Sequence, residues 1–266
     1  MTLSTQGTRV RDALRRNRAL RAAVVARRHR GLRRDDLFLA SYPRSGNTWI
    51  RFLLADLVTG KQASFQSVDE MLPNVGAHEG APGLAGGRRL IKTHEAWRPE
   101  YHHGVYLIRD VRDVLISWYR VTRPDPDDLS DLDAFVSDFT THRASPYGCW
   151  SDHVRSWQRA SERGLPITVY RFEDLKADPA RALRDVAAAL EIPATDEQVE
   201  GALARNTPEE MRRLEQEGTD YLKRAVGHRS MGVRRGKVGG WRELLGEQHL
   251  RALEPLLAFN RELGYE

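Results

Sequence analysis

The segment from residue 37 to residue 49 constrains the fold of this chain more than any other part. It begins with four apolar residues, 37–40, a run with the length and composition of a buried parallel strand. Pro43 and Gly46 end that strand, and apolar residues then recur at helical spacing as far as Gly60. A strand that turns directly into a helix predicts an α/β fold with a parallel sheet.

The turn inside this segment has the composition of an anion-binding loop. Arg44 supplies a positive charge, Ser45 and Thr48 supply hydroxyls, and the helix that follows begins with unpaired backbone N–H groups. Charge, donors and helix dipole together attract a phosphate or sulfate. The loop is P-loop-like without matching the Walker pattern, because Asn47 stands in the place of the Walker lysine. The alternative is an ordinary strand–turn–helix connection.

Length and composition favour a globular protein. A chain of 266 residues can form one large α/β domain or two small ones. We find no apolar run near the roughly 20 residues that cross a bilayer, and no secretory leader pattern at the N-terminus. Cys149 is the single cysteine, so an intrachain disulfide is impossible. These features together predict a cytoplasmic protein.

The positive charge is concentrated near the N-terminus. The formal net charge is +5, yet residues 9–34 alone contain 11 arginines against one acidic residue, Asp12. We therefore expect a basic arm, residues 1–34, attached to a nearly neutral α/β domain, residues 35–266. Apolar residues among the arginines permit an amphipathic helix that contacts an anionic membrane surface peripherally or binds an anionic glycan. The alternative is a solvated, partly disordered tail.

Further elements follow in α/β order. Strands are expected at 89–94, 105–108 and 167–170, and glycine-rich irregular segments at 61–88 and 218–240. Helices are expected at 110–119, where Asp110 can act as the N-cap, and at 131–141, 149–163, 179–190, 207–217 and 247–263. Strands that alternate with helices predict a single domain with a central parallel sheet flanked by helices.

The loop itself suggests a family. Residues 42–49, Tyr-Pro-Arg-Ser-Gly-Asn-Thr-Trp, resemble the 5′-phosphosulfate loop of the sulfotransferases, which usually reads Tyr-Pro-Lys-Ser-Gly-Thr-Thr-Trp. The resemblance implies that 3′-phosphoadenosine 5′-phosphosulfate (PAPS) binds at this loop. The implied cofactor-binding residues there are Arg44, Ser45, Gly46, Asn47, Thr48 and Trp49. Arg44 replaces the usual lysine, so a planar fork replaces a compact ammonium group.

A second segment supplies groups for proton transfer. Residues 90–94, Leu-Ile-Lys-Thr-His, resemble the strand end where sulfotransferases place a catalytic histidine near a lysine. The attacking acceptor hydroxyl must lose a proton, and imidazole is the side chain whose pKa suits this near neutrality. The resemblance implies that His94 is the general base and that Lys92, with Arg44, stabilises the leaving phosphate. A structural histidine at a strand end is the alternative.

A third segment resembles the 3′-phosphate segment of the family. Arg109 is expected at the carboxyl end of a strand, where ligands bind in α/β sheets. Ser117 follows about two helical turns later, so it can face the same site. A guanidinium and a hydroxyl suit a terminal phosphate. The alternative for Arg109 is an exposed salt bridge with Asp113.

The remaining matches are late in the chain. Residues 233–241 resemble the basic, glycine-rich loop that covers the nucleotide, and they imply Arg234, Arg235 and Gly236 as cofactor contacts. Two looser matches imply adenine contacts at Phe172, which replaces a tyrosine, and at Thr207. The resemblance runs from about residue 37 to residue 241.

Together these segments predict a sulfotransferase that moves the sulfuryl group of PAPS to a hydroxyl of a small molecule or glycan. We expect in-line transfer with no metal ion, since cationic side chains and N–H groups can neutralise the transferred group. An alternative interpretation is that the chain is an ATP-dependent small-molecule or nucleotide kinase. A non-catalytic binder of anionic membranes or nucleic acid, acting through the basic arm, is another, although we expect no nucleic-acid partner.

Overall fold

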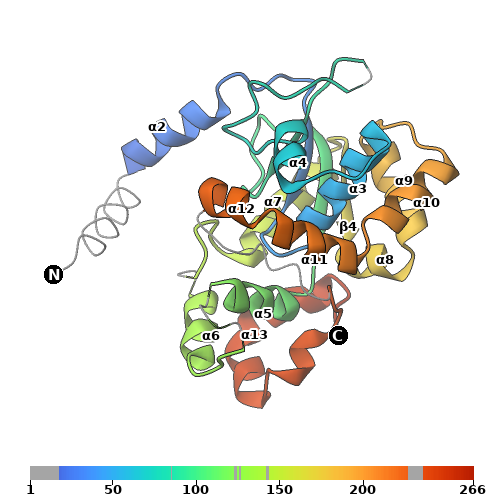
Figure 1. Cartoon of the computed structure of the whole chain (residues 1–266). Coiled ribbons are helices and arrows are strands. Elements are labelled where there is room, and N and C mark those ends of the chain that lie inside the picture. The colour runs from blue at the N-terminus through green and yellow to red at the C-terminus, as the bar shows by residue number, and fades with distance from the viewer. Residues whose placement is uncertain (1–17, 85, 123–124, 126, 142–143, 227–235) are drawn as a thin grey trace.

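The computed structural model describes residues 18–84, 86–122, 125, 127–141, 144–226 and 236–266. In the described part the chain forms one parallel sheet of four strands in the order β2-β1-β3-β4, with helices on both faces (Figure 1). The strands are β1 Leu37–Ser41, β2 Leu90–Thr93, β3 His103–Ile108 and β4 Ile167–Arg171. The predicted α/β class and all four predicted strands are confirmed.

The apolar run of β1 packs on two cores at once. Alternate side chains of a strand point to opposite faces. Phe38 and Ala40 join the core on one face of the sheet, and Leu37 and Leu39 join the core on the other. Because every position of β1 is buried, the run needs no polar alternation, as expected for a central parallel strand.

Helices cover the sheet on both sides. On the side of Leu37 lie α3 and α9, and on the side of Phe38 lie α5, α7 and α13, as their buried residues show. The bounds are α3 Asn47–Thr59, α4 Phe65–Met71, α5 Val111–Val121, α6 Leu132–Thr140, α7 Trp150–Glu162, α8 Phe172–Ala177, α9 Pro179–Ala189, α10 Asp196–Arg205, α11 Pro208–Glu217, α12 Thr219–Val226, the 3₁₀ turn Gly240–Glu243 and α13 Glu247–Glu262.

Helix ends follow the predicted signals. Gly60 ends α3 in the left-handed conformation, with φ 71°, and donates its N–H to the carbonyl of Asp56. Asp110 caps α5, where its side chain accepts from the N–H of Arg112.

Two segments predicted to be irregular contain helices. α4 lies inside 61–88, and α12 occupies the described start of 218–240. α4 is short, and its capping box pairs Ser64 with Ser67, a serine where Glu or Gln is the familiar signal. Neither α8 nor α10 was predicted, so the sequence analysis missed four helices in the described part of the chain.

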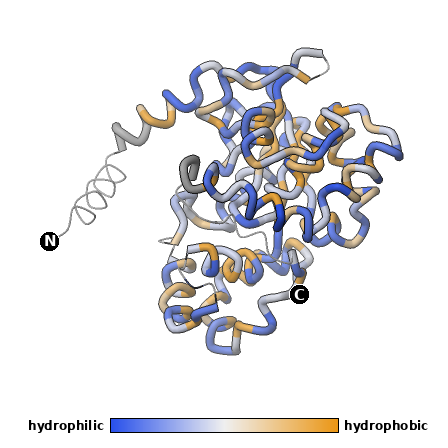
Figure 2. Tube along the Cα trace, viewed as in Figure 1, coloured by the Kyte–Doolittle hydropathy of each residue, from blue (hydrophilic) through white to orange (hydrophobic). Residues whose placement is uncertain are grey.

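Helix α2, Arg18–His29, lies within the predicted basic arm and extends away from the body of the molecule (Figures 1 and 2). Its last turn contacts the body: Arg28 donates to the carbonyl of Val75 at 3.0 Å and forms an ion pair with Glu95. The boundary between arm and domain stays a prediction. No helix in the described ranges is both long enough and apolar enough to cross a membrane.

Candidate active site

The loop between β1 and α3 depends on backbone geometry that few residues adopt. Arg44 and Gly46 have φ values of 73° and 90°, in the left-handed region. A Cβ added at Gly46 would lie 2.4 Å from Cδ2 of Phe172. Position 46 therefore requires glycine both for its backbone angle and for the close approach of this ring.

Arg44 and Arg109 connect the loop to α5. The Nε of Arg44 donates to Oγ of Ser117 at 2.9 Å, and Nη1 of Arg109 donates to the carbonyl of Arg44 at 3.1 Å. The predicted 5′-phosphosulfate loop and the predicted 3′-phosphate residues thus meet at the carboxyl ends of β1 and β3.

The late glycine-rich loop reaches the same place. Nη2 of Arg109 donates to the carbonyl of Lys237 at 2.9 Å, while the carboxylate of Asp113 accepts from the N–H groups of Gly239 and Trp241. A Cβ at Gly236 would lie 3.8 Å from the ring of Phe172. Arg234 and Arg235 lie outside the described residues.

Arg109 does more than pair with an acidic neighbour. Its ion pair with Asp113 spans 3.6 Å, but both side chains are buried, so it differs from the exposed salt bridge considered as an alternative. The guanidinium also lies 4.6 Å from the centroid of the Phe172 ring. Phe172 is only 3% exposed, so its ring packs between Gly46 and Arg109.

His94 lies directly against the end of β1. Its Nδ1 is 2.9 Å from the carbonyl oxygen of Ser41 and 3.3 Å from Oγ of the same residue. A carbonyl oxygen only accepts, so Nδ1 carries the proton and Nε2 keeps a lone pair that can take one. Burial, and then the charge of Lys92, hold the pKa of His94 well below its usual value, which favours this neutral form.

Positive charge is crowded around the loop. Burial and then the charge of Arg51 lower the pKa of Lys92 to about 7, and burial and then Arg109 lower the pKa of Arg44 to about 10. Because neighbouring cations contribute to both shifts after burial, an anion placed among them would be stabilised.

Arg51 is a residue that the sequence analysis missed. It is 4% exposed on α3, where one Nη donates to the carbonyls of Val68 and Leu72 and to Asp69. The available signal was an arginine inside the apolar run 49–54, which has to be paired when the helix is buried.

Buried donors without partners fit an anionic ligand. Oγ of Ser45 and Nε of Arg109 are both buried, and neither has a hydrogen-bond partner among the described residues. Leaving such groups unpaired costs free energy unless a ligand pairs them. The loop residues therefore suit a phosphate or sulfate group.

The remaining predicted contacts, Trp49, Thr207 and Asn47, lie near the start of α3. Trp49 Nε1 donates to the carbonyl of Asn206, which places Thr207 beside the start of α3, and Nζ of Lys176 lies 5.0 Å from the Trp49 ring centroid. The hydroxyl of Thr207 caps α11. Asn47 is turned inward, because its Nδ2 donates to Oγ of Ser41. The Asn47 side chain is therefore bound to β1, and its backbone N–H is the group that can contact an anion.

The described residues include no group of three or more His, Cys, Asp or Glu side chains placed to hold a metal ion.

These features are typical of an α/β protein whose cations and N–H groups gather at the carboxyl ends of its strands, beside a neutral imidazole. The sulfotransferase domain family model matches residues 34–258. The chain therefore belongs to the sulfotransferase family of PAPS-dependent enzymes, and the family resemblance predicted from the sequence is confirmed.

Individual relatives agree with this assignment. The chain is 27% identical over 233 residues to sulfotransferase 1A1 of Bos taurus, covering 78% of this chain and 77% of the relative. It is 28% identical over 209 residues to flavonol 4′-sulfotransferase of Flaveria chlorifolia, covering 69% and 64% of the two chains.

Solved structures share the fold. Mouse sulfotransferase SULT7A1 complexed with PAP, 3′-phosphoadenosine 5′-phosphate, has a TM-score of 0.64 at 21% identity over 86% of this chain and 84% of its own. Retinol dehydratase in complex with androsterone and inactive cofactor PAP has a TM-score of 0.66 at 20% identity, covering 86% and 81%.

Proposed function

We propose that this sulfotransferase moves the sulfuryl group of PAPS to a hydroxyl of a small-molecule or glycan acceptor, with His94 as general base. The observation that carries the proposal is the position of the imidazole. Its Nδ1 is held by the end of β1, two residues before the anion-binding loop begins, so a lone pair on Nε2 stays available. The retained proton on Nδ1 and the lowered pKa both favour a base over an acid.

PAPS supplies the sulfuryl group and a phosphate leaving group when it is bound. In the proposal, residues 44–49 bind the 5′-phosphosulfate through N–H groups, the Ser45 hydroxyl and Arg44. Arg109 and Ser117 bind the 3′-phosphate. The adenine lies near Trp49, Phe172 and Thr207, and the late loop at 234–236 closes over the nucleotide.

Each chemical role follows from position and charge. His94 accepts the acceptor's proton at Nε2, which makes the hydroxyl oxygen a stronger nucleophile. Lys92 and Arg44 offset the negative charge that develops on the leaving oxygen. Because these cations are already in place, little reorganisation is needed during the reaction. We propose that no metal ion takes part.

The proposed partners of the chain are the acceptor and, through the basic arm, an anionic membrane surface. We propose a hydroxyl-bearing small molecule as the acceptor, in line with the flavonol named for one relative. Peripheral contact of the basic arm with anionic membranes also stays a prediction. Liposomes with and without anionic lipid would test it: flotation of the whole chain, but not of a chain beginning at Asp35, would support the contact.

The transfer assay tests the proposed function. The protein is incubated with radiolabelled PAPS and a panel of a simple phenol, a flavonol and a glycan, with EDTA or with Mg²⁺. We expect label to move to at least one hydroxyl acceptor at the same rate in both conditions. Loss of transfer in EDTA would contradict the metal-free mechanism. Phosphoryl transfer from ATP with no transfer from PAPS would favour the kinase alternative.

A further inference from the structure

Side chains of α7 hold the backbone that carries His94. Nε2 of His153 donates to the carbonyl of His94 at 3.0 Å, and Nε1 of Trp157 donates to the carbonyl of Glu95 at 3.1 Å. The side chains of His153 and Trp157 are fully buried, so water does not compete for these bonds. Two consecutive carbonyls after β2 are therefore held by ring N–H groups from one helix.

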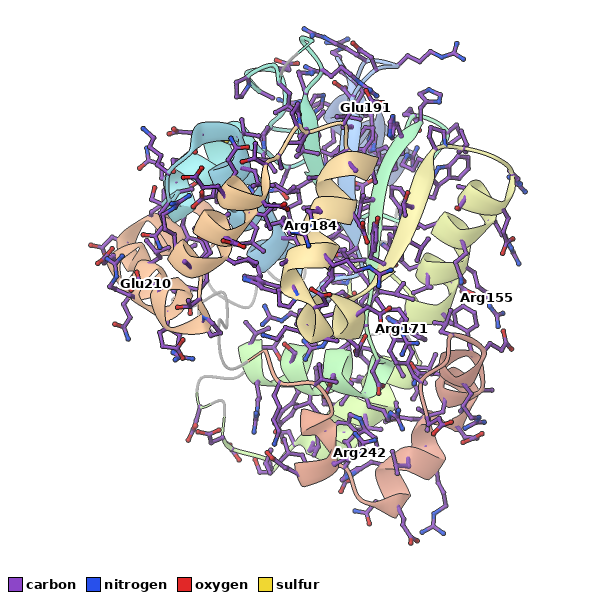
Figure 3. All side chains as sticks on the ribbon, turned by 90° about the vertical axis from the view of Figure 1, so that its right-hand side faces the viewer. Arg155, Arg171, Arg184, Glu191, Glu210 and Arg242 are labelled. Carbon is purple, nitrogen blue, oxygen red and sulfur yellow. The ribbon has the colours of Figure 1, made fainter. Side chains whose placement is uncertain are left out.

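Ser156 adds a third contact on the same helix. Its hydroxyl accepts from the backbone N–H of Trp97 at 2.9 Å and donates to the carbonyl of His153 at 2.6 Å. Residues 153, 156 and 157 are spaced i, i+3 and i+4, so they lie on one face of α7. Arg155, labelled in Figure 3, instead lies over the ring of Phe259 in α13.

The surroundings of His153 leave it one hydrogen-bonding arrangement. Because its Nε2 carries the proton donated to a carbonyl, its Nδ1 must accept, and the hydroxyl of Tyr106 donates to it at 2.8 Å. The ring of Tyr42 packs edge-on at 5.3 Å. Burial lowers the pKa of His153 to about 4, so this neutral tautomer persists at neutral pH.

We propose that His153 is a positioning residue for His94. Its N–H holds the His94 carbonyl, and this sets the direction from which the His94 imidazole reaches Ser41 and faces the loop. The inference rests on the proposed role of His94 as general base. A misplacement near 1 Å at a reacting group costs on the order of 100-fold in rate. We therefore expect loss of the His153 N–H to lower kcat and to leave nucleotide affinity almost unchanged.

The decisive variants are His153→Phe and His153→Gln. We expect His153→Phe to lower kcat about 30-fold, as a loosened His94 spends less time in place, while the Kd for PAP changes less than twofold. The acid limb of the kcat–pH profile would move to higher pH as the pKa of His94 recovers toward its ordinary value. His153→Gln returns an N–H near the original Nε2 position, so we expect it to recover most of the lost kcat.

Arg155→Ala is the matched control, because it alters the same helix on the face that packs on α13, and we expect its kcat to stay within twofold. If His153→Phe does not fold, His153→Asn is the second variant, because its shorter amide lies near the original Nδ1 position and does not reach the carbonyl of His94. We expect it to lower kcat about fivefold, in keeping with loss of one hydrogen bond.

Two results separate the possible failures. A folded His153→Phe protein, or where that variant does not fold a folded His153→Asn protein, with the kcat and pH profile of the wild type would overturn the positioning role. If His94→Ala is also fully active, the proposed function of His94 fails as well. If His94→Ala is inactive, only the inference about His153 fails.

Discussion

The two sides of the proposed active site, one for the nucleotide and one for the acceptor, are held in different ways. On the nucleotide side, the loop 43–48 is held by backbone conformation, with positive φ at Arg44 and Gly46 and a helix start directly behind them. On the acceptor side, the segment 94–97 follows a strand of four residues and is held by side chains from α7, far away in the sequence. The first segment takes its shape from its own backbone geometry, to which Arg109 and Ser117 add contacts, whereas the second segment is held by side chains from a distant helix.

Charge also differs between the two sides. The loop side collects cations whose pKa values are lowered by burial and by each other, which suits an anionic nucleotide. The acceptor side pairs its charges: Glu95 lies 3.0 Å from Arg28 and 3.3 Å from His29. A neutral imidazole between the two sides fits a reaction in which a neutral hydroxyl attacks an anionic donor.

The largest effect on kcat is expected from the loss of His94, which lies between the two sides. His94→Ala removes the general base, and we expect kcat to fall about 10²- to 10⁴-fold, the usual contribution of such a group. The Kd for PAP should change less than threefold, because the loop is unaltered. Steady-state kinetics and calorimetry measure both quantities. An alanine variant that bound PAP and kept wild-type turnover would remove His94 from this role.

A substitution at Gly46 tests whether the backbone geometry of the loop 43–48 is needed to bind PAP. Gly46→Ala forces a Cβ into the Phe172 ring at a positive φ. Strain of this kind costs on the order of 1–3 kcal/mol, so we expect PAP to bind about 10- to 100-fold more weakly. Gly60→Ala is the control: its φ is also positive, but nothing lies within 4 Å of the added atom, so it should lower the Tm alone. Unchanged PAP affinity in Gly46→Ala would contradict the geometry.

Lys92 gives the site a dependence on pH. Its pKa of about 7 in the free protein means that it loses its proton as the pH rises through neutrality, and with the proton goes its attraction for an anion. We expect wild type to bind PAP up to about tenfold more tightly than Lys92→Met at pH 6, and equally at pH 9. Titration of the PAP phosphates affects both proteins alike, so the difference isolates Lys92. A constant difference across this range would show that Lys92 does not titrate there.

Truncation of the arm is expected to have the smallest effect. A chain beginning at Asp35 lacks Arg28 and His29, which contact Glu95 next to the proposed base. We expect a loss of about 1–2 kcal/mol in stability and a two- to fivefold lower kcat/KM for the acceptor. A chain beginning at Arg18 keeps those contacts and serves as the control. Identical kinetics of all three proteins would exclude α2 from the acceptor side.

Sequence reasoning succeeded where the signal was local. The strand, loop and helix at 37–60 appear in one continuous pattern, and the Asp110 cap lies beside the helix it starts. The parallel sheet followed from the alternation of strands and helices. These features depend on neighbours in the sequence, so composition and spacing were sufficient.

Other parts of the site depend on residues that only the fold brings together. His153 is 59 residues from His94, and nothing in its helix marks it as a donor to that backbone. The contact of Phe172 with the adenine stays a prediction, and the fold also places its ring against Gly46 and Arg109. The capping box of α4 pairs Ser64 with Ser67 and lacks the Glu or Gln that usually marks such a helix start. Tertiary packing supplied this information, and no local pattern carried it.

Calorimetric titration with PAP, compared with ADP and ATP and repeated with and without Mg²⁺, tests most directly whether the cations and N–H groups at the strand ends form a site for a doubly phosphorylated adenosine. We predict that PAP binds at least about tenfold more tightly than ADP, because only PAP carries a 3′-phosphate for a charge-assisted contact with Arg109. We also predict that Mg²⁺ leaves this affinity unchanged. Preference for ATP in the presence of Mg²⁺, with PAP bound no better than ADP, would contradict the assignment of this site.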